Sequence, residues 1–421
     1  MKYYSNLVVP IAGFYVLAPS LLAPTATAFV GVVQPLTHRT LHNPTTTTTT
    51  TTLFGTSTTK EESTDLQNSV TDLKKVLERE YVSFFNPMRT EYYATDVTFD
   101  DPLTTLEGVD AYKTNVDMLA GRTLLGSILF EDGGINLHSV TGGEISDDTD
   151  GTIEDIITRW TLRFTMKVWP WKPTARFSGI SVYKVKSIDN ANGVQIVGQL
   201  DYWDSINLKE GGTYEKVSKG DALADFINQL KPGGFEAKSA APELPYSLLR
   251  RGTDYEVRNY PAYYAVKLQY DRRDEGFGTL GSFTNGVETP QGPAIMQVED
   301  ADNKYMQWPL TFAAPGSDTA LEPKLALQKL RSEPQYKNCE ILLIPSKIVA
   351  VSEFSDASLE PVVRKGDRQL RASLKRDGLD YVVDDAGGTS KVTFAQFDAI
   401  HSMGKRRGEV WIDLKDGGHP W

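Results

Sequence analysis

The sequence predicts an α+β protein of two domains, and three observations carry this prediction. The chain has 421 residues, which is enough for two ordinary domains with a leader and a linker. In the first half, segments with helical periodicity precede long strand-like runs, which is typical of helices packed on an antiparallel sheet. In the second half, the order strand, helix, strand, strand occurs twice. We expect that half to form a distorted antiparallel β-barrel with two flanking helices.

Charge and cysteine content exclude some classes of function. The formal net charge is −11, and the acidic surplus lies after residue 60, because the first 60 residues contain neither Asp nor Glu. A chain this acidic has no general electrostatic means of holding nucleic acid, so we expect no nucleic-acid partner. The single cysteine, Cys339, excludes an intramolecular disulfide framework and a multi-cysteine metal cluster, and we expect it to be a small core residue.

Residues 1–28 have the character of a signal peptide. An apolar run over 7–23 follows Lys2, and the small residues Ala26 and Ala28 fit a signal-peptidase site. The run is short for a membrane span and is interrupted by two prolines, so cleavage is expected. An uncleaved anchor is the alternative.

The segment 29–62 is predicted to be a transit peptide or disordered. It is rich in Thr, weakly basic and free of acidic residues up to Lys60, and it has little apolar surface to bury. The junction "ATAF" resembles the bipartite leaders of algae with complex plastids, in which the aromatic residue after the cleavage site matters. This resemblance implies a plastid (chloroplast) location, with a secreted or endomembrane protein as the alternative.

The first folded domain is expected over residues 65–210. Apolar residues at three- and four-residue spacing predict amphipathic helices in "DLQNSVTDLKKVLEREYVSFF" and "GVDAYKTNVDMLA". Three long strands are predicted after them, at 153–168, 174–186 and 193–206. The segment "VWPWKP" should turn between the first two strands, because its two prolines cannot continue a ladder.

Four aspartates of this domain are candidates for acid–base chemistry: Asp100, Asp101, Asp201 and Asp204. A carboxyl group in an apolar, aromatic pocket has a raised pKa and can act as a general base. The alternative is structural, because "DDP" is a turn signature in which Asp accepts backbone N–H groups. Strand alternation also places Asp201 and its neighbour Tyr202 on opposite faces. The enzymatic hypothesis therefore requires at least one of the four to face a cavity.

Residues 211–243 are predicted to connect the two domains. The segment "SKGDALADFINQL" places apolar residues at helical spacing, and a Pro-Gly-Gly sequence ends that helix. A flexible link follows, with the domain boundary near residue 240. His138, the histidine of the first domain, is expected to be a hydrogen-bonded core or rim residue rather than a base.

The second domain is expected over residues 244–421. In the stretch 248–271, the even positions from Ala262 to Tyr270 are apolar or aromatic, and the odd positions from Lys267 onward are polar. This alternation predicts a half-buried strand. Its buried face is suited to a protein core or to a flat aromatic ligand.

Two helices and several strands complete this domain. A short glycine-rich helix is predicted in "EGFGTLGSFTNG", and a longer helix over 358–379 begins at Ser358 and ends at Gly378. The remaining strands are predicted at 294–300, 304–312, 339–354, 391–400 and 408–414.

Four segments in order resemble the SOUL haem-binding family: "YEVRNYPAYYAV", "GFGTLGSFTNG", "KYMQWPL" and "KRRGEVWI". The chain departs from the family pattern at Gln307 and Leu310, where Thr and Val are usual, and at Gly408, where Asn is usual. The run "VTFDDPLTTLEGVDAY", with "TRWTL", "WPWKP", "FSGISVY" and "DYWDSI" after it, resembles a plant and algal domain of unknown function. That domain is similar to the cone-shaped nuclear-transport-factor-2-like folds, and its relatives are often fused ahead of a SOUL domain.

The SOUL resemblance implies binding of haem or another tetrapyrrole. A porphyrin is a flat apolar disc with two carboxylates, so it needs aromatic walls and a few cations. We expect binding without a protein axial ligand, because no ligand motif of the family maps onto His401. The candidate binding residues are Tyr255, Arg258, Tyr260, Tyr264, Phe277, Leu280, Met306, Trp308, His401 and Arg406.

Other cations have structural interpretations. The basic face of the helix at 358–379 is expected to be a solvated surface, and a weak contact with an anionic membrane surface or a protein partner is the alternative. Arg406 and Arg407 precede Glu409, which we expect to pair with an arginine across the sheet.

The sequence therefore predicts a plastid carrier or buffer of haem or related tetrapyrroles. No nucleophile elbow, phosphate loop or zinc-ligand spacing is evident in the sequence. The first alternative is an isomerase- or cyclase-type enzyme, in which the first domain acts on an apolar small molecule. The second alternative is a non-enzymatic scaffold.

Overall fold

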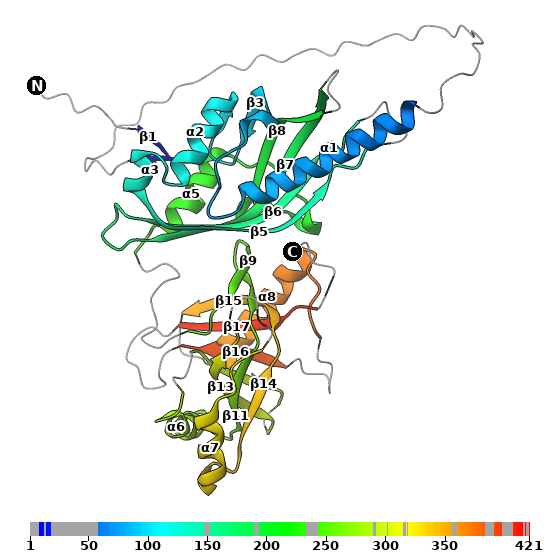
Figure 1. Ribbon diagram of the computed structural model, residues 1–421. Helices are drawn as coiled ribbons and strands as arrows, with labels where there is room; N and C mark the ends of the chain where they lie inside the picture. The colour runs from blue at the N-terminus through cyan, green and yellow to red at the C-terminus, as the bar shows by residue number, and fades with distance from the viewer. Residues whose placement is uncertain are drawn as a thin grey trace, which may run out of the picture.

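The computed structural model describes residues 8–11, 14–17, 58–146, 152–188, 193–232, 243–288, 292–300, 302–314, 317, 319–355, 360–383, 391–397, 407–415, 417 and 421. Beyond the leader, two sheets organise these residues, one of six strands and one of nine, and each packs against its own hydrophobic core (Figure 1). The α+β prediction is confirmed for both halves. Within the predicted leader, β1 (Val8–Ile11) pairs with β2 (Phe14–Leu17), and the predicted cleavage site lies outside the described residues.

The six-stranded sheet has the order β4-β3-β8-β7-β6-β5. All its neighbouring strands are antiparallel except β3 and β8, which are parallel. The predicted strands and the turn between β6 and β7 are confirmed, whereas the periodicity did not reveal β3, β4 and β5. The strand bounds are β3 (Tyr93–Asp100), β4 (Thr105–Glu107), β5 (Phe130–Gly142), β6 (Ile156–Met166), β7 (Thr174–Ile188) and β8 (Gly193–Trp203).

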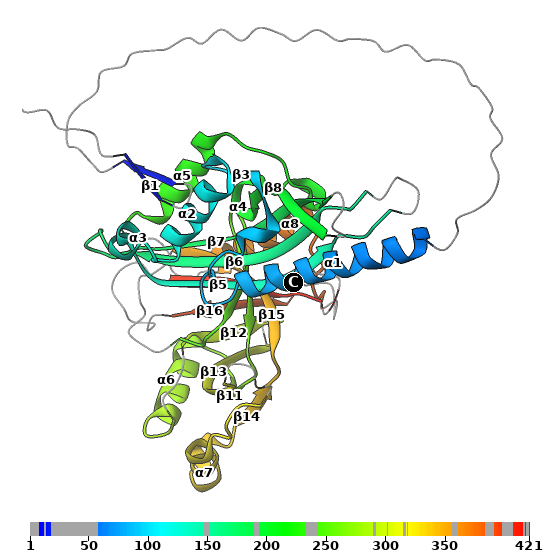
Figure 2. The ribbon, with the colours of Figure 1, turned by 45° about the horizontal axis from the view of Figure 1, so that its top comes forward.

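Helices cover the inner face of this sheet. Both predicted amphipathic helices are confirmed, as α1 (Thr58–Glu80) and α2 (Val109–Leu119), and α3 (Leu124–Leu129) follows α2. In Figure 1 these helices lie on the side of the sheet that faces away from the nine-stranded sheet, and Figure 2 shows β6 and β7 bending beneath them. The connector helix is also confirmed, as α5 (Lys219–Gln229), and its Phe226 packs into the same core. Short helical turns complete the segment: η1 (Thr90–Tyr92), α4 (Asp204–Asn207) and η2 (Glu210–Gly212).

The nine-stranded sheet is built from two equivalent halves. Its order is β14-β11-β13-β12-β16-β17-β15-β10-β9, and every neighbouring pair is antiparallel. Apart from β9, the order reads the same from both ends, because β11, β12 and β13 match β15, β16 and β17. The strand that opens each half pairs with the other half, since β10 joins β15 and β14 joins β11. The predicted repeat of strand, helix, strand, strand is therefore confirmed.

The predicted helices and the later strands are confirmed, whereas α7 (Lys324–Ser332) was not predicted and the stretch 248–271 forms three strands rather than one. The helices are α6 (Arg273–Thr284), α7 (Lys324–Ser332) and α8 (Glu360–Arg376), with a 3₁₀ turn η3 (Pro334–Tyr336). The strands are β9 (Ser247–Arg251), β10 (Glu256–Tyr260), β11 (Tyr263–Gln269), β12 (Ala294–Val298), β13 (Lys304–Phe312), β14 (Cys339–Ile344), β15 (Lys347–Ser355), β16 (Val392–Gln396) and β17 (Arg407–Asp413).

Two expectations for this domain need correction. The sheet does not close into a barrel, because in the described residues β14 and β9 are its two edges. The strand β11 is buried on both faces, since Tyr263 and Ala265 pack in one core cluster and Val266 and Leu268 in another. The strand is therefore not half-buried, because chain segments cover the sheet on both sides. Cys339 is a buried thiol in the core, as expected.

The two domains meet through polar contacts between β7 and β9. The Arg251 backbone N–H donates to Ser178 Oγ over 2.6 Å, and the Arg251 guanidinium donates to both oxygens of Asp225 on α5, each over 2.9 Å. The Trp421 ring lies beside Arg250 and Arg159, which belong to different domains. The predicted boundary near residue 240 falls in a segment outside the described residues.

Candidate functional site

A cavity lies between α1, α2 and the inner face of the six-stranded sheet, and it has about 820 Å³ of empty volume, part of it open to solvent. Its walls are mainly apolar and aromatic. The apolar and aromatic lining residues are Tyr81, Phe85, Met88, Tyr93, Phe99, Tyr112, Val116, Leu119, Ile135, Trp160, Leu162, Phe177, Tyr183 and Trp203. The polar lining residues are Glu80, Asn86, Asp101, Asn115, Ser181, Gln199 and Asp201.

Buried hydroxyl groups form a hydrogen-bonded web at one wall of this cavity. Tyr81 OH lies 2.9 Å from Tyr183 OH and 3.2 Å from Ser181 Oγ. Trp160 Nε1 donates to Ser181 Oγ over 2.9 Å, and Gln199 Nε2 donates to the same oxygen over 3.3 Å. The web orients Gln199, which in turn positions the carboxylate of β8.

Asp201 ends this web on the cavity side. Gln199 Nε2 donates to Asp201 Oδ1 over 2.7 Å, and Tyr112 OH donates to Gln199 Oε1. Burial raises the pKa of Asp201 to about 6, although hydrogen bonds from Gln199 and Ser181 act in the opposite direction. At pH 7 the ionised form of Asp201 therefore predominates.

Asp101 also faces the cavity, from the turn between β3 and β4. Its Oδ1 accepts the backbone N–H groups of Leu103 and Thr104 over 2.7 and 2.6 Å, so the predicted turn signature is confirmed. Burial, reinforced by repulsion from Asp201, raises the pKa of Asp101 to about 8 despite these two hydrogen bonds. At pH 7 the protonated form of Asp101 predominates. Asp101 and Asp201 thus differ in protonation state at pH 7.

The other two candidate aspartates do not line the cavity. Asp100 pairs with Lys216 over 2.6 Å near the surface. Asp204 is buried on the outer side of the sheet, where Arg159 Nη2 lies 2.5 Å from its Oδ2. Burial raises the pKa of Asp204, but the guanidinium groups of Arg159 and Arg250 outweigh it and leave the pKa below its usual value. These two carboxylates stabilise the fold.

His138 and Tyr202 occupy structural positions. His138 Nε2 lies 3.1 Å from Thr161 Oγ1, and burial lowers the pKa of His138 to about 4, so the ring is neutral at pH 7. The predicted alternation is confirmed at β8, because Asp201 lines the cavity while Tyr202 packs against Tyr214, with ring centroids 5.6 Å apart.

In the C-terminal domain, the predicted tetrapyrrole residues are divided between the two faces of the sheet. The face covered by α6 and α8 carries Tyr255, Leu280 and Met306 in its core, with Phe277 and Trp308 packed against them. Tyr264 belongs to the same face, because it alternates with the buried Val266 along β11. Arg258 and Tyr260 lie on the opposite face.

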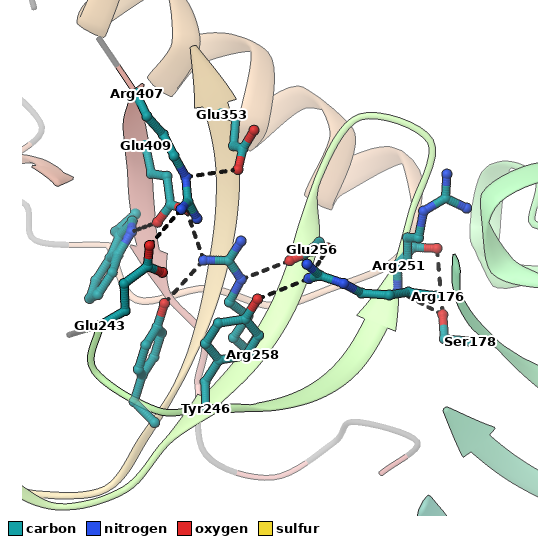
Figure 3. Close-up of polar contacts among 12 residues, drawn as sticks. Arg176, Ser178, Glu243, Tyr246, Arg251, Glu256, Arg258, Glu353, Arg407 and Glu409 are labelled. Atoms are coloured by element: carbon teal, nitrogen blue, oxygen red, sulfur yellow. Dashed lines mark hydrogen bonds and ion pairs between the residues drawn. The ribbon is translucent and has the colours of Figure 1, made fainter. Parts of the chain in front are cut away.

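The guanidinium of Arg258 forms two buried ion pairs (Figure 3). Its Nε donates to Glu256 Oε2 over 2.8 Å, and its Nη1 donates to Glu409 Oε1 over 2.9 Å. Arg407 Nη2 also donates to Glu409 Oε1, over 3.0 Å, so the predicted pairing of Glu409 with an arginine is confirmed. Arg176 of the first domain reaches the same network through Tyr246 and Glu256. These contacts are internal to the protein and satisfy Arg258 without a ligand.

Several other predicted tetrapyrrole-binding residues are buried in the core and contact other core residues. Tyr255 OH donates to Asp377 Oδ2 over 2.8 Å, and the ring of Tyr260 stacks on Trp411 with centroids 4.7 Å apart. Leu280 and Met306 are fully buried. His401 and Arg406 lie outside the described residues.

Three predicted residues keep accessible surface and form what we call the aromatic patch: Tyr264, Phe277 and Trp308, together with Leu343. The rings of Phe277 and Trp308 meet edge to face with centroids 5.6 Å apart. Val266 lies opposite Trp308, and Tyr264 lies opposite Leu343, so Tyr264, Trp308 and Leu343 share one face of the sheet. Leu343 is 50% exposed. The indole Nε1 of Trp308 is buried without a hydrogen-bond partner, and Gly278 of α6 faces open space.

Half of the six cations of α8 form ion pairs within the described part of the protein. Arg364 pairs with Glu360 over 2.7 Å, and Arg371 pairs with Asp367 over 2.9 Å. Arg376 Nε lies 2.7 Å from Asp377 Oδ1. These pairs account for three of the cations that the sequence placed on this helix.

Sequence reasoning missed most of the N-terminal cavity. Tyr81, Tyr93, Tyr112 and Tyr183 come from four different elements, and each looks like an ordinary core aromatic in its local pattern. The available signal was the pair Gln199 and Asp201. These polar residues lie two apart on β8, on the face whose other residues are apolar.

The described residues offer few other kinds of site. None of the helices in this part of the chain combines the length and the apolar character that crossing a lipid bilayer requires. Within the same residues, no group of three or more His, Cys, Asp and Glu side chains is placed to hold a metal ion.

Two family models match the chain. Residues 241–413 match the model described as "SOUL heme-binding protein", and residues 71–192 match the model described as "Uncharacterized conserved protein (DUF2358)". The first match supports a haem-binding role for the C-terminal segment. No curated protein matches the sequence.

Solved structures resemble the chain only distantly. They include a hydrolase from Listeria innocua, with 10% identity over 43% of this chain and 96% of its own and a TM-score of 0.28. The epoxide hydrolase/cyclase-like enzyme SalBIII has 14% identity over 34% of this chain and 88% of its own, with a TM-score of 0.20. The C-terminal domain of EcmrR has 8% identity over 40% of this chain and 98% of its own, with a TM-score of 0.26. Likenesses at these TM-scores support no conclusion about function.

Proposed function

We propose that the protein, whose residues 241–413 match the SOUL haem-binding family, is a carrier or buffer of haem or a related tetrapyrrole. The observation that carries the proposal is this family match. The aromatic patch beside α6 is the part of the C-terminal domain that suits a flat apolar ligand. A carrier needs reversible binding rather than chemistry at the ligand, so a surface of this kind is sufficient.

The aromatic patch offers the kind of surface that a tetrapyrrole ring needs. Phe277 and Trp308 offer apolar ring surface, and burial of such surface contributes about 25 cal/mol per Å². Gly278 follows Phe277 on α6, is exposed, and leaves the adjoining helix surface uncrowded. Arg272, at the start of α6, has a 70% exposed side chain in a surface ion pair that a propionate could exchange. When bound, haem would supply a strong Soret absorbance that reports on its surroundings.

Titration of haemin and of protoporphyrin IX into the full chain tests this proposal. We expect saturable Soret changes with both compounds, because binding without an axial ligand tolerates the absence of iron. Trp308→Leu should weaken both about tenfold. Tyr305→Leu is the matched control, because Tyr305 lies on the same strand but on the opposite face. Equal affinities in the two variants would remove the patch from the proposal, and no saturable binding in the native protein would remove the carrier function.

The plastid location is part of the proposal and rests on the leader sequence. Fusion of residues 1–62 to a fluorescent protein should direct the reporter to the plastid of an alga with complex plastids. Replacement of Phe29 by Ala should retain the reporter outside that organelle. Secretion of both fusions would favour the endomembrane alternative.

A second candidate function is acid–base catalysis in the N-terminal domain. The observation that favours it is that Asp101 and Asp201 both line one cavity. In the simplest reaction, Asp201 removes a proton from carbon next to a carbonyl group while Asp101 protonates the carbonyl oxygen, which gives an enol. The reverse steps return the proton to carbon, so no co-reactant is needed.

Deuterium exchange tests the catalytic candidate. The full chain should accelerate exchange of the α-protons of 2-tetralone in D₂O, observed by NMR, and Asp201→Asn should reduce the acceleration at least tenfold. Asp100→Asn is the matched control, because Asp100 lies beside Asp101 in sequence but pairs with Lys216 away from the cavity. Equal rates with the native protein and with the Asp201 variant would eliminate this candidate.

A further inference from the structure

We propose that the N-terminal cavity binds an uncharged, largely apolar molecule that carries one hydroxyl donor and one carbonyl acceptor. Asp201 receives the donor and Asp101 donates to the acceptor. This inference rests on the same cavity as the catalytic candidate, but it concerns binding and holds whether or not the bound molecule reacts.

The walls select for a molecule with flat apolar parts. The rings of Phe99 and Tyr112 stack with centroids 4.8 Å apart, and those of Phe177 and Trp203 lie 4.5 Å apart at another part of the wall. Such surfaces bury hydrocarbon and aromatic rings well, because both partners lose water-exposed area.

The charges of the lining exclude anionic ligands. None of the described residues that line this cavity is Lys, Arg or His, whereas Glu80, Asp101 and Asp201 all carry carboxyl groups. A carboxylate or phosphate on the ligand would have no cation to pair with and would be repelled by Asp201. The propionates of a tetrapyrrole are therefore disfavoured here, so this cavity is distinct from the aromatic patch of the C-terminal domain.

The two aspartates have different hydrogen-bonding capacities. Asp101 uses Oδ1 for the two N–H groups of its turn, and no hydrogen bond to its Oδ2 is recorded among the described residues. Because burial raises the pKa of Asp101 to about 8, this carboxyl group carries a proton at neutral pH and can donate it to a carbonyl oxygen. Asp201 is held through Gln199 and has a pKa of about 6, so it accepts from a hydroxyl group. One site thus offers a donor and an acceptor, as an uncharged hydroxy-carbonyl compound requires.

The other titratable groups of the cavity do not reverse this assignment. They are Glu80, Tyr81, Tyr93, Tyr112 and Tyr183, from α1, β3, α2 and β7. Burial raises the pKa of each tyrosine, that of Tyr81 to about 12, so the phenols stay neutral between pH 5 and pH 9. Burial also raises the pKa of Glu80, whose two oxygens already accept from Tyr93 OH and from the Arg89 backbone N–H.

Naphthalene and four of its derivatives test the inference with the full chain, read by quenching of Trp160 and Trp203 at the cavity wall. We expect 2-naphthol and 2-acetylnaphthalene to bind about tenfold more tightly than naphthalene, and 2-naphthoate not to bind. Asp201→Asn should weaken 2-naphthol about tenfold and leave naphthalene unchanged. Asp100→Asn should leave all affinities unchanged.

The pH profile separates a binding role of Asp101 from a structural one. In the native protein, affinity for 2-acetylnaphthalene should fall as pH rises from 7 to 9, because Asp101 loses the proton that it donates. Asp101→Asn keeps an N–H donor and should make that affinity independent of pH. If a variant lacks the native near-ultraviolet circular dichroism, the profile of the native protein decides alone.

Three results would overturn the inference. They are 2-naphthoate or 2-(aminomethyl)naphthalene binding as tightly as 2-naphthol, equal affinity for naphthalene and 2-naphthol, and a flat native pH profile. Binding without deuterium exchange would eliminate the catalytic candidate but leave the inference standing. Haemin binding has a separate readout, the Soret band, so failure of the carrier proposal is distinguishable from failure here.

Discussion

Arg258 of β10 and Glu409 of β17 form an ion pair in the core of the C-terminal domain, with Nη1 and Oε1 2.9 Å apart and side chains 2% and 0% exposed. Glu256 holds the other side of the same guanidinium. Two residues of the SOUL-like motifs therefore neutralise each other's charge, and they lie on the face of the sheet opposite α6 and α8. This arrangement changes what the substitution of Arg258 is expected to do.

Arg258→Met should destabilise the protein rather than abolish tetrapyrrole binding. The substitution leaves the carboxylates of Glu256 and Glu409 without their shared cation, and breaking a buried pair in this way costs about 3–5 kcal/mol. Urea unfolding followed by circular dichroism measures the loss. Arg272→Gln is the control and should change stability by less than about 0.5 kcal/mol, because Arg272 is exposed. A variant of native stability that no longer binds haemin would instead assign Arg258 to a propionate.

The pair Arg251–Asp225 should couple the two domains. Arg251 Nη1 donates to Asp225 Oδ2 and Arg251 Nη2 donates to Asp225 Oδ1, each over 2.9 Å, and the side chains are only 12% and 15% exposed. A double-mutant cycle with Arg251→Ala and Asp225→Ala should yield a coupling energy of about 1–2 kcal/mol in urea unfolding. Single substitutions that sum to the effect of the double variant would show that the contact contributes nothing of its own.

Asp101 should make the N-terminal domain less stable as pH rises. Its pKa is raised from 3.8 to about 8 in the folded protein, so the folded state binds a proton that the unfolded state releases. The stability from this group is fully present below pH 3.8 and is lost as pH rises to about 8, at no more than about 1.4 kcal/mol per pH unit.

Asp101→Asn should remove much of that dependence. The amide keeps an oxygen for the N–H groups of Leu103 and Thr104, and it cannot ionise. Thermal unfolding at pH 5 and pH 8 should therefore show a smaller loss of midpoint temperature in the variant than in the native protein. The same loss in both proteins would mean that Asp101 does not retain its proton in the fold.

Two glycines of α6 should respond oppositely to Ala. At Gly278 a Cβ would meet nothing within 4 Å, so Gly278→Ala should stabilise the protein by about 0.5–1 kcal/mol through helix propensity. At Gly276 a Cβ would lie 3.2 Å from Tyr270 Cβ and 3.3 Å from Met306 Cε, so Gly276→Ala should be destabilising by about 1 kcal/mol or more. Chemical denaturation of the two variants makes the comparison, and equal effects would contradict the close approach of α6 to β13.

Much of the fold was predictable because it follows from local periodicity. The helices α1, α2, α5 and α8 have continuous apolar faces, so their positions follow from spacing alone. The repeat in the second domain follows from the order of its elements. By contrast β5 was missed, because its glycines and polar residues give no clear alternation. The open edge at β14 was missed because closure depends on strand pairs far apart in sequence.

The candidate sites were predictable to a smaller extent. Asp101 and Asp201 were named as candidates together with Asp100 and Asp204, and the pattern gave no means of ranking the four. Among the candidate tetrapyrrole-binding residues, the family motifs include some that are buried in the core and some that remain accessible to solvent. Both Arg258 and Trp308 belong to these motifs. Motif membership alone therefore does not show that Arg258 is held in internal ion pairs while Trp308 lies at the patch.

The sequence by itself determined the types of the elements with clear periodicity. It also determined the two-halved order of the second domain, the turn made by Asp101 and the opposite orientation of Asp201 and Tyr202. These depend on neighbours within a few residues, where backbone geometry sets which side chains share a face. Only the tertiary structure decided which aspartates line the cavity and on which face each predicted binding residue lies. The reason is physical: alternation assigns a residue to one of two faces, but what covers each face is set by strand pairs and helices distant along the chain.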